Sequence, residues 1–350
     1  MSGFSGTRRP DPNHQPRFLV VRLGSLGDVI HGIPAAAALR VRFPHARIDW
    51  LVDPRYVELL DLVECIDSPI ALDPRDLRIG GGHGWSVLKG LRAAHYDAVV
   101  DLQGLLKSAV LGRLAGATRT IGAPWAHLRE PLARLFYTDA PDPGAAPHVI
   151  DKNLGLLGPL DVTDRTVHFP IRIPRTDTVT SVVDRFGPDG YAILNPGAAW
   201  PNKRWPAARF GAVAASIRRE HGWRSVVLWG PGDQELAASV AAASQGASEV
   251  APPTTITDIV GIARAARLMV SGDTGPIHIA GAVGTPLVAL FGPTSPERNG
   301  PWAARDVTLS RVAGCSCIYE RRCRRAVPCI DDITTDEVVQ AVRERVSAHA

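Results

Sequence analysis

Short apolar runs rich in branched residues alternate with glycine turns and helix-like segments, and this alternation restricts the fold more than any other feature. The first such unit runs from an apolar stretch at 17–23 through the glycine turn 24–27 to a helical pattern over 28–43. A strand, a glycine turn and a helix in that order open a βαβ unit. Further strands are expected at 48–52 and 96–102.

The same pattern restarts in the second half of the chain, with strands expected at 191–194, 225–229, 268–271 and 286–291. Strands that alternate with helices predict parallel sheets covered on both faces. We therefore expect an α/β fold with two Rossmann-like domains that face each other across a cleft. In such sheets, ligands bind at the carboxyl ends of the strands.

The domain boundary is placed in an irregular, proline-bearing stretch. The expected parts are a disordered tail at 1–16, an N-terminal domain at 17–165, a linker at 166–188, a C-terminal domain at 189–333 and a closing helix at 334–350. The tail is polar and carries no apolar segment of the kind found in secretory signals.

Composition and charge favour a soluble enzyme over a membrane or nucleic-acid protein. Hydrophobic residues make up 45% of the chain, and the net charge is only +4. No uninterrupted apolar stretch of about 18 residues is present. The slight charge excess and the lack of a known motif argue against nucleic acid as a partner. We expect a cytoplasmic protein with at most a peripheral membrane contact.

Two local clusters near the C-terminus carry alternative interpretations. Four thiols within 15 residues suit a structural metal site, although their spacing departs from paired zinc knuckles. The alternative is reduced cysteines that pack a C-terminal loop. A basic cluster in the same stretch is either a patch for an anionic surface or a solvated loop. The thiols are Cys315, Cys317, Cys323 and Cys329, and the basic residues are Arg321, Arg322, Arg324 and Arg325.

The turn Gly24-Ser-Leu-Gly27 and the following Asp28 form the first cluster with chemical potential. The glycines allow close backbone approach to a ligand, and the helix N-terminus offers free N–H groups. Asp28 is interpreted either as a first-turn acid that favours the helix dipole or as a general base aimed into the cleft.

Two further clusters lie in the second half. Gly272-Asp-Thr-Gly-Pro-Ile-His278 follows a strand and opens a helix, so its N–H groups suit a diphosphate. His278 is expected to contact a ligand, the alternative being a satisfied core histidine. Lys203 follows a strand exit and suits a phosphate leaving group, the alternative being an exposed surface lysine.

Four motifs, taken together and in order, resemble the heptosyltransferases of glycosyltransferase family 9. They are Gly-Ser-Leu-Gly-Asp-Val-Ile-His at 24–31, Asp-Leu-Gln-Gly-Leu-Leu-Lys-Ser-Ala at 101–109, Lys-Arg-Trp-Pro at 203–206 and Gly-Asp-Thr-Gly-Pro-Ile-His at 272–278. The resemblance extends from about residue 17 to 345. Segments 129–137 and 148–151 are more similar to the heptosyltransferase I branch.

The resemblance implies a GT-B fold, inversion at the anomeric carbon, and neither a catalytic metal nor a cofactor. It implies an ADP-heptose donor and, as acceptor, the Kdo inner core carried on lipid A. By position, Asp28 matches the catalytic base. The donor-binding matches are Lys203, Asp273, Thr274, Gly275 and His278. The acceptor-binding positions are Arg22, Ser25, Gly27, Gln103, Arg129, His148 and Lys152.

The sequence departs from the family pattern at two places. The donor-site acid has no clean match, since Gln234 falls in register and Glu235 lies one residue away. Lys152 stands where arginine is common.

The alternatives to a heptosyltransferase are a family 9 transferase with another acceptor, a sugar-nucleotide 2-epimerase of GT-B type, or a non-catalytic nucleotide-binding module.

The tract 129–137 mixes arginines with apolar residues. This mixture suits an anionic lipid surface and favours a peripheral contact with the cytoplasmic face of the inner membrane. The alternative is an ordinary amphipathic helix packed on its own sheet. The apolar residues are Leu132, Leu135, Phe136 and Tyr137, and the basic ones are Arg129 and Arg134.

Overall fold

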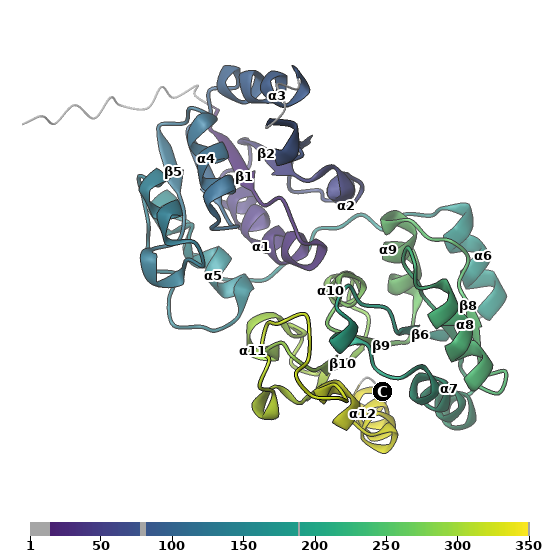
Figure 1. Cartoon of the computed structure of the whole chain (residues 1–350). Coiled ribbons are helices and arrows are strands. Elements are labelled where there is room, and N and C mark those ends of the chain that lie inside the picture. The colour runs from purple at the N-terminus through teal and green to yellow at the C-terminus, as the bar shows by residue number, and fades with distance from the viewer. Residues whose placement is uncertain (1–14, 78–81, 188–189, 349–350) are drawn as a thin grey trace, which may run out of the picture.

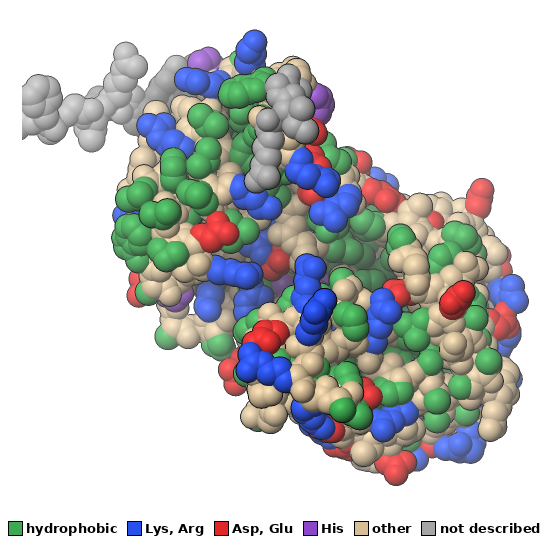
Figure 2. Space-filling model, in the orientation of Figure 1, with side chains coloured by type: hydrophobic (Ala, Val, Ile, Leu, Met, Phe, Trp, Pro, Cys, Tyr) green, Lys and Arg blue, Asp and Glu red, His purple; other side chains and the backbone are tan. Residues whose placement is uncertain are grey.

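The computed structural model describes residues 15–77, 82–187 and 190–348, so most of the expected tail and the last two residues lie outside the described part. Two parallel sheets, each covered by helices, form two lobes that meet along one side (Figures 1 and 2). The fold is therefore α/β with two Rossmann-like domains, as the alternation of strands and helices predicts. None of the helices in the described residues combines the length and apolarity needed to span a bilayer.

The N-terminal sheet has the strand order β3-β2-β1-β4-β5. In its centre, Val20 pairs with Trp50 on one side and with Val100 on the other. The strands are β1 (Arg17–Val21), β2 (Arg47–Val52), β3 (Ser68–Ala71), β4 (Ala98–Asp101) and β5 (Arg119–Ile121). The helices are α1 (Leu26–Arg42), α2 (Val57–Leu60), α3 (Gly82–Ala93), α4 (Leu106–Leu114) and α5 (Val149–Gly155), with short 3-10 helices η3 (Trp125–His127) and η4 (Pro131–Phe136).

The C-terminal sheet has the strand order β11-β10-β9-β6-β7-β8, the doubly wound order of a Rossmann fold. Its strands are β6 (Tyr191–Asn195), β7 (Arg224–Val227), β8 (Ser248–Val250), β9 (Leu268–Gly272), β10 (Leu287–Phe291) and β11 (Val307–Ser310). Its helices are α6 (Asp177–Phe186), α7 (Ala207–His221), α8 (Gln234–Ala243), α9 (Ile256–Ala265), α10 (Gly275–Ala282), α11 (Pro296–Asn299) and α12 (Thr335–Ser347).

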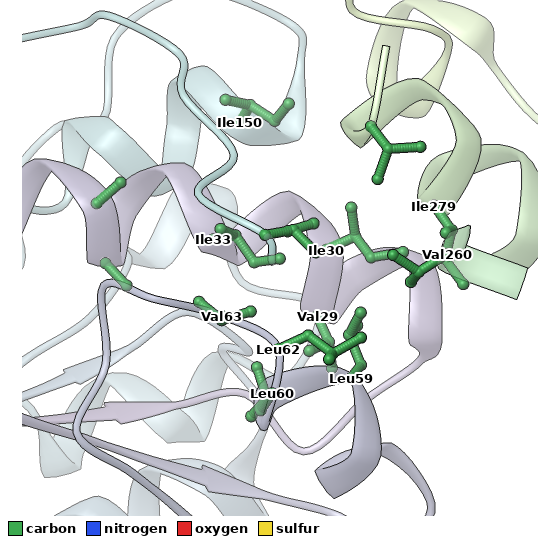
Figure 3. Packing of buried hydrophobic residues seen from close by; sticks show 14 of the residues in the cluster. Val29, Ile30, Ile33, Leu59, Leu60, Leu62, Val63, Ile150, Val260 and Ile279 are labelled. Atoms are coloured by element: carbon green, nitrogen blue, oxygen red, sulfur yellow. The ribbon is translucent and has the colours of Figure 1, made fainter. Parts of the chain in front are cut away.

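The two domains share a continuous apolar contact below the cleft. Ile30 and Ile33 of α1 pack within the N-terminal domain, while Val260 of α9 and Ile279 of α10 reach the same cluster from the C-terminal domain (Figure 3). A hydrogen bond of 2.8 Å from the backbone N–H of Thr257 to the Glu58 carboxylate also crosses the boundary. This packing fixes α1 against α10 and so brings the loops of both sheets together.

Candidate active site between the two domains

A cleft of about 900 Å³ opens where the loops at the carboxyl ends of the two sheets meet. On the face drawn in Figure 2, Lys and Arg side chains gather near the junction of the lobes. The N-terminal wall contains the predicted residues Arg22, Ser25, Gly27, Asp28, Gln103 and Arg129. The opposite wall contains the predicted residues Lys203, Asp273, Thr274, Gly275 and His278. The structure thus brings together all but two of the predicted contact residues.

Asp28 lies in the first turn of α1 and both caps this helix and faces the cleft. Its Oδ2 accepts hydrogen bonds from the backbone N–H of Ser25 at 3.1 Å and from the Ser25 hydroxyl at 2.9 Å. Its Oδ1 lies 2.5 Å from Nη2 of Arg22 and 3.9 Å from Nη2 of Arg298. Because the side chain is 23% exposed, the carboxylate remains accessible to a ligand.

The charges around Asp28 keep it ionised. Burial by itself raises the pKa of this carboxyl group, but Arg22, Arg298 and the hydrogen bonds from Ser25 outweigh burial and hold the pKa below its ordinary value. An ionised carboxylate that is partly exposed has the properties required to accept a proton from a bound hydroxyl group.

Asp273 is the centre of the opposite wall, and its carboxylate is occupied by neighbouring side chains. Oδ2 lies 2.5 Å from Lys203 Nζ and accepts a hydrogen bond of 2.8 Å from the Thr294 hydroxyl. Oδ1 accepts a hydrogen bond of 2.8 Å from Asn299 and lies 3.3 Å from His278 Nε2. Its side chain is only 6% exposed. The carboxylate is therefore placed to orient Lys203 and His278. The sequence predicts that Asp273 itself contacts the donor, whereas this arrangement favours an action through its two neighbours.

The N-terminus of α10 points its backbone N–H groups toward the cleft. Thr274 is the N-cap residue, but its side chain makes no capping hydrogen bond. Its hydroxyl instead accepts a hydrogen bond of 2.9 Å from the side-chain amide of Asn195. Since the first N–H groups of a helix lack partners within the helix, they favour an anion. With Lys203 alongside, this arrangement suits a diphosphate.

Two of the predicted contact glycines also allow the domains to touch. A Cβ on Gly27 would lie 2.4 Å from Cδ2 of His278, and a Cβ on Gly275 would lie 2.5 Å from Cδ2 of Leu26. Each glycine thus removes a side chain at the point where α1 meets α10. Close packing between helices explains these glycines in addition to the close ligand approach inferred from the sequence.

His148, expected on the acceptor side, does not belong to the described residues that line the cleft. Its Nδ1 accepts the backbone N–H of Ile150 at 3.2 Å and so caps α5. Its Nε2 lies 3.1 Å from the carbonyl oxygen of Gly300 in the other domain. Lys152 lines an adjoining cavity of about 150 Å³, which also contains Arg298.

Several residues that line the cleft were missed by the sequence analysis. One group follows β10, and the rule that ligands bind at the carboxyl ends of strands would have identified it. Another group comes from the loop before α12 and from the segment after β6. The missed residues include Thr294, Arg298 and Asn299 after β10, Tyr319 before α12, Trp200 after β6, and His127 of η3 in the N-terminal domain.

The arginines of the basic cluster before α12 differ in their surroundings: one lines the cleft, and two form surface ion pairs. Arg321 lines the cleft, with its guanidinium carbon 6.0 Å from the centre of the Trp200 ring. Arg324 pairs with Glu320 at 2.7 Å, and Arg325 pairs with Asp332 at 2.6 Å. The first interpretation of the cluster, a patch for an anion, therefore fits Arg321 alone among these three.

Neither Gln234 nor Glu235 takes the place of the family's donor-site acid in the cleft. Both residues begin α8, and neither belongs to the described residues that line the cleft. The preceding acid, Asp233, is the N-cap residue of α8 and pairs with Arg204 at 2.8 Å. A Cβ on Gly197 would lie 2.5 Å from Oδ2 of Asp233, so this carboxylate faces the loop after β6.

The four C-terminal thiols do gather in the fold. The sulfur atoms of Cys315 and Cys317 lie 3.5 Å apart, and those of Cys317 and Cys323 lie 3.6 Å apart, with Cys329 in the same buried cluster. Within the described ranges, however, no group of three or more His, Cys, Asp and Glu side chains is arranged to hold a metal ion. The arrangement thus gives no support to the metal site, and the alternative interpretation, reduced cysteines that pack a loop, stays a prediction.

Two Rossmann-like domains that face each other across a cleft, with an ionised carboxylate on one wall and a lysine beside a helix N-terminus on the other, match the GT-B fold of solved heptosyltransferases. Residues 84–326 match the family described as glycosyltransferase family 9 (heptosyltransferase). The chain belongs to this family.

Relatives and solved structures cover nearly the whole chain. Lipopolysaccharide heptosyltransferase 1 of Pseudomonas aeruginosa is 29% identical over 320 residues, which cover 88% of this chain and 87% of the relative. The family 9 glycosyl transferase of Veillonella parvula has a TM-score of 0.82 at 25% identity, covering 95% and 98% of the two chains. E. coli heptosyltransferase WaaC, solved with ADP, has a TM-score of 0.77 at 24% identity, covering 94% and 99%. The last likeness shows the shared fold.

Proposed function

We propose that this enzyme transfers L-glycero-D-manno-heptose from ADP-heptose to the Kdo inner core of lipopolysaccharide, with inversion at the anomeric carbon. The observation that carries the proposal is the ionised Asp28 carboxylate, which faces Lys203 and the N-terminus of α10 across the cleft. The name of the relative from Pseudomonas aeruginosa supports the same sugar and pathway.

Asp28 serves as the general base in this proposal. The acceptor oxygen forms a bond to the anomeric carbon while the bond from that carbon to the diphosphate oxygen breaks. The hydroxyl proton passes to the Asp28 carboxylate, which is partly exposed for this purpose. Arg22 at 2.5 Å fixes the orientation of the carboxylate.

The opposite wall stabilises the departing ADP. Negative charge develops on the β-phosphate as the sugar leaves, and preorganised donors aimed at that position lower the barrier. Lys203, oriented by Asp273, and the first N–H groups of α10 are such donors. His278, held near Asp273, is placed to contribute from the same wall.

The acceptor occupies the N-terminal wall. Kdo carries a carboxylate and lipid A carries phosphates, so this substrate requires a cationic site. Arg22 and Arg129 line the main cleft, and Lys152 lines the adjoining cavity, where Arg298 of the C-terminal domain approaches this wall. We place the reaction at the cytoplasmic face of the inner membrane, where the enzyme makes a peripheral contact. The proposal involves no nucleic acid.

The direct test incubates the purified enzyme with ADP-heptose and Kdo-lipid A and follows the mass of the lipid. We expect the mass to increase by one heptose and ADP to be released. ADP release without any gain in lipid mass contradicts the acceptor assignment, and the absence of both contradicts the proposed reaction.

The variant Asp28→Asn tests the base. We expect turnover to fall by about 10²–10⁴-fold with nearly unchanged ADP affinity, the usual scale for loss of a general base. Asp336→Asn is the matched control, because Asp336 also lies in the first turn of a helix but on the exposed surface of α12. Near-normal turnover of Asp28→Asn would reduce Asp28 to a helix-capping residue.

A further inference from the structure

Five large apolar side chains lie exposed on adjacent segments of the N-terminal domain. Leu106 and Leu114 of α4 are 37% and 38% exposed, Trp125 of η3 is 51% exposed, and Leu132 and Leu135 of η4 are 59% and 68% exposed. η4 packs against both α4 and η3. We call these residues, with the basic side chains between them, the α4–η4 surface. Figure 2 shows hydrophobic side chains gathered on the outer side of this lobe.

Packing of these segments on their own sheet does not account for the exposed residues. Positions 106, 107, 110, 113 and 114 fall within an arc of about 120° on α4, at about 100° per residue. The opposite side of α4, including Ser108 and Leu111, is buried. In η4, Ala133 is buried beside Tyr137, whose hydroxyl donates to Asp101 at 2.7 Å. The expected membrane tract therefore loses Tyr137 to the core but keeps the two outer leucines.

Basic side chains accompany the apolar ones. The outer arc of α4 carries Lys107 and Arg113. Arg129 precedes η4, and Arg134 lies within η4. The acid in this region, Glu130, accepts the backbone N–H of Leu106 at 2.7 Å and so caps α4. Exposed apolar residues surrounded by cations match a surface of anionic lipids, which attracts the cations and receives the apolar side chains.

The α4–η4 surface is continuous with the acceptor wall of the cleft. Gln103, Gly104 and Leu105 line the cleft and lead directly into α4. His127 ends η3 and Arg129 precedes η4, and both line the cleft as well. A lipid surface against α4 and η4 would therefore meet the cleft on the wall that carries Asp28.

We propose that the α4–η4 surface docks on an anionic lipid bilayer and that this contact presents a lipid-anchored acceptor to the cleft. The inference rests on the proposed function, because an acceptor anchored in a membrane is what the contact serves. It adds the surface and the lipid chemistry by which the enzyme reaches that acceptor.

Vesicle flotation of the full chain tests the docking surface. With vesicles rich in phosphatidylglycerol, we expect the wild type to float, and with pure phosphatidylcholine we expect little binding. Leu132→Ser with Leu135→Ser should lower partitioning by about tenfold or more, because each leucine loses its apolar burial in the lipid. Lys107→Gln with Arg113→Gln should lower it by about fivefold per charge. High salt should weaken the wild type in the same direction.

Val41→Ser is the matched control for the leucine variant. Val41 is 68% exposed, as is Leu135, but it lies near the C-terminal end of α1, outside the α4–η4 surface. Equal flotation of the leucine variant and Val41→Ser overturns the proposal. So does a dimer of the wild type in sedimentation that the leucine variant converts to a monomer, because the surface then binds a second copy of the chain.

A comparison of acceptors separates this inference from the proposed function. On Kdo-lipid A embedded in vesicles, the leucine variant should lose kcat/KM in parallel with its loss of flotation. On a water-soluble Kdo acceptor without lipid, it should match the wild type, which also shows that the variant is folded. Loss on both acceptors overturns the docking role. Flotation of the wild type without transfer to either acceptor contradicts the proposed function and leaves the lipid contact standing.

Discussion

At the scale of residues, two aspartates on opposite walls of the cleft have different surroundings, and the proposed roles differ accordingly. Asp28 keeps a partly exposed carboxylate and shares its charge with Arg22 and Arg298. Asp273 is almost fully buried and is bonded on both oxygens. A carboxylate whose oxygens are both bonded is suited to hold other groups, whereas an accessible one is suited to accept a proton, as proposed for Asp28.

The pH profile of Arg298→Gln should reveal the charge state of Asp28. The base acts when ionised, and its depressed pKa means that activity persists as the pH falls until the pH reaches that pKa. Removing the guanidinium 3.9 Å from Oδ1 raises the pKa, so kcat/KM should begin to fall at a higher pH. Arg305→Gln, on an exposed arginine, should keep the wild-type profile. Coincident acid limbs for Arg298→Gln and wild type would show that Asp28 does not set this limb.

Lys203→Ala should weaken the donor much more than the acceptor. Loss of a charged hydrogen bond to a phosphate corresponds to about 1.5–3 kcal/mol, which raises the ADP Kd by about 10–100-fold. Calorimetric titration with ADP measures this change, and Lys89→Ala on the exposed side of α3 is the control. Equal ADP affinity in Lys203→Ala and wild type would move the diphosphate away from Lys203.

At the scale of elements, the meeting of α1 and α10 determines how closely the two walls approach. Gly27→Ala places a Cβ 2.4 Å from the His278 ring, which is packed against His31 and Asp273. We expect a loss of about 1–3 kcal/mol in the free energy of unfolding, the usual effect of overpacking. Gly90→Ala in α3, where a Cβ meets open space, should instead gain about 0.5–1 kcal/mol. Denaturant unfolding measures both changes. Equal free energies of unfolding for Gly27→Ala and the wild type would mean that α1 and α10 move apart without penalty.

Elements were predictable from the sequence where their residues are buried on both sides. The central strands β1, β6 and β9 read as apolar runs followed by glycine or polar turns, and their loops carry the predicted site. The edge strands β3 and β11 are half-buried throughout, and β5 and β8 have only three residues. Such strands owe their pairing to a neighbour distant in the chain, so no local pattern identifies them.

At the scale of the whole molecule, the cleft depends on contacts that the sequence order hides. Arg298 approaches Asp28 from far along the chain only because α11 follows a strand of the facing sheet. The contact of His148 with Gly300 is hidden in the same way, because Gly300 belongs to the other domain. Motifs indicate which residues have the required chemistry, whereas the packing of the domains decides which of them meet.

The proposed placement of the acceptor on the N-terminal domain and of the donor on the C-terminal domain leads to a prediction for acceptor binding. Arg129 in the main cleft and Lys152 in the adjoining cavity both belong to the N-terminal domain, away from the Lys203 wall. If these cations hold the carboxylate and phosphates of the acceptor, Arg129→Glu and Lys152→Glu should each raise the acceptor KM by about 10–100-fold, the scale of a lost charged hydrogen bond.

The donor KM in both variants should remain nearly unchanged, because the donor groups lie on the opposite domain. Arg92→Glu on the exposed surface of α3 is the control for the change in net charge. Steady-state kinetics with each substrate varied in turn separates the two constants. If both variants transfer heptose to Kdo-lipid A as well as wild type does, an anionic acceptor does not bind here. A parallel rise in donor and acceptor KM would instead show that the reversed charges disturb the cleft as a whole and do not act on the acceptor alone.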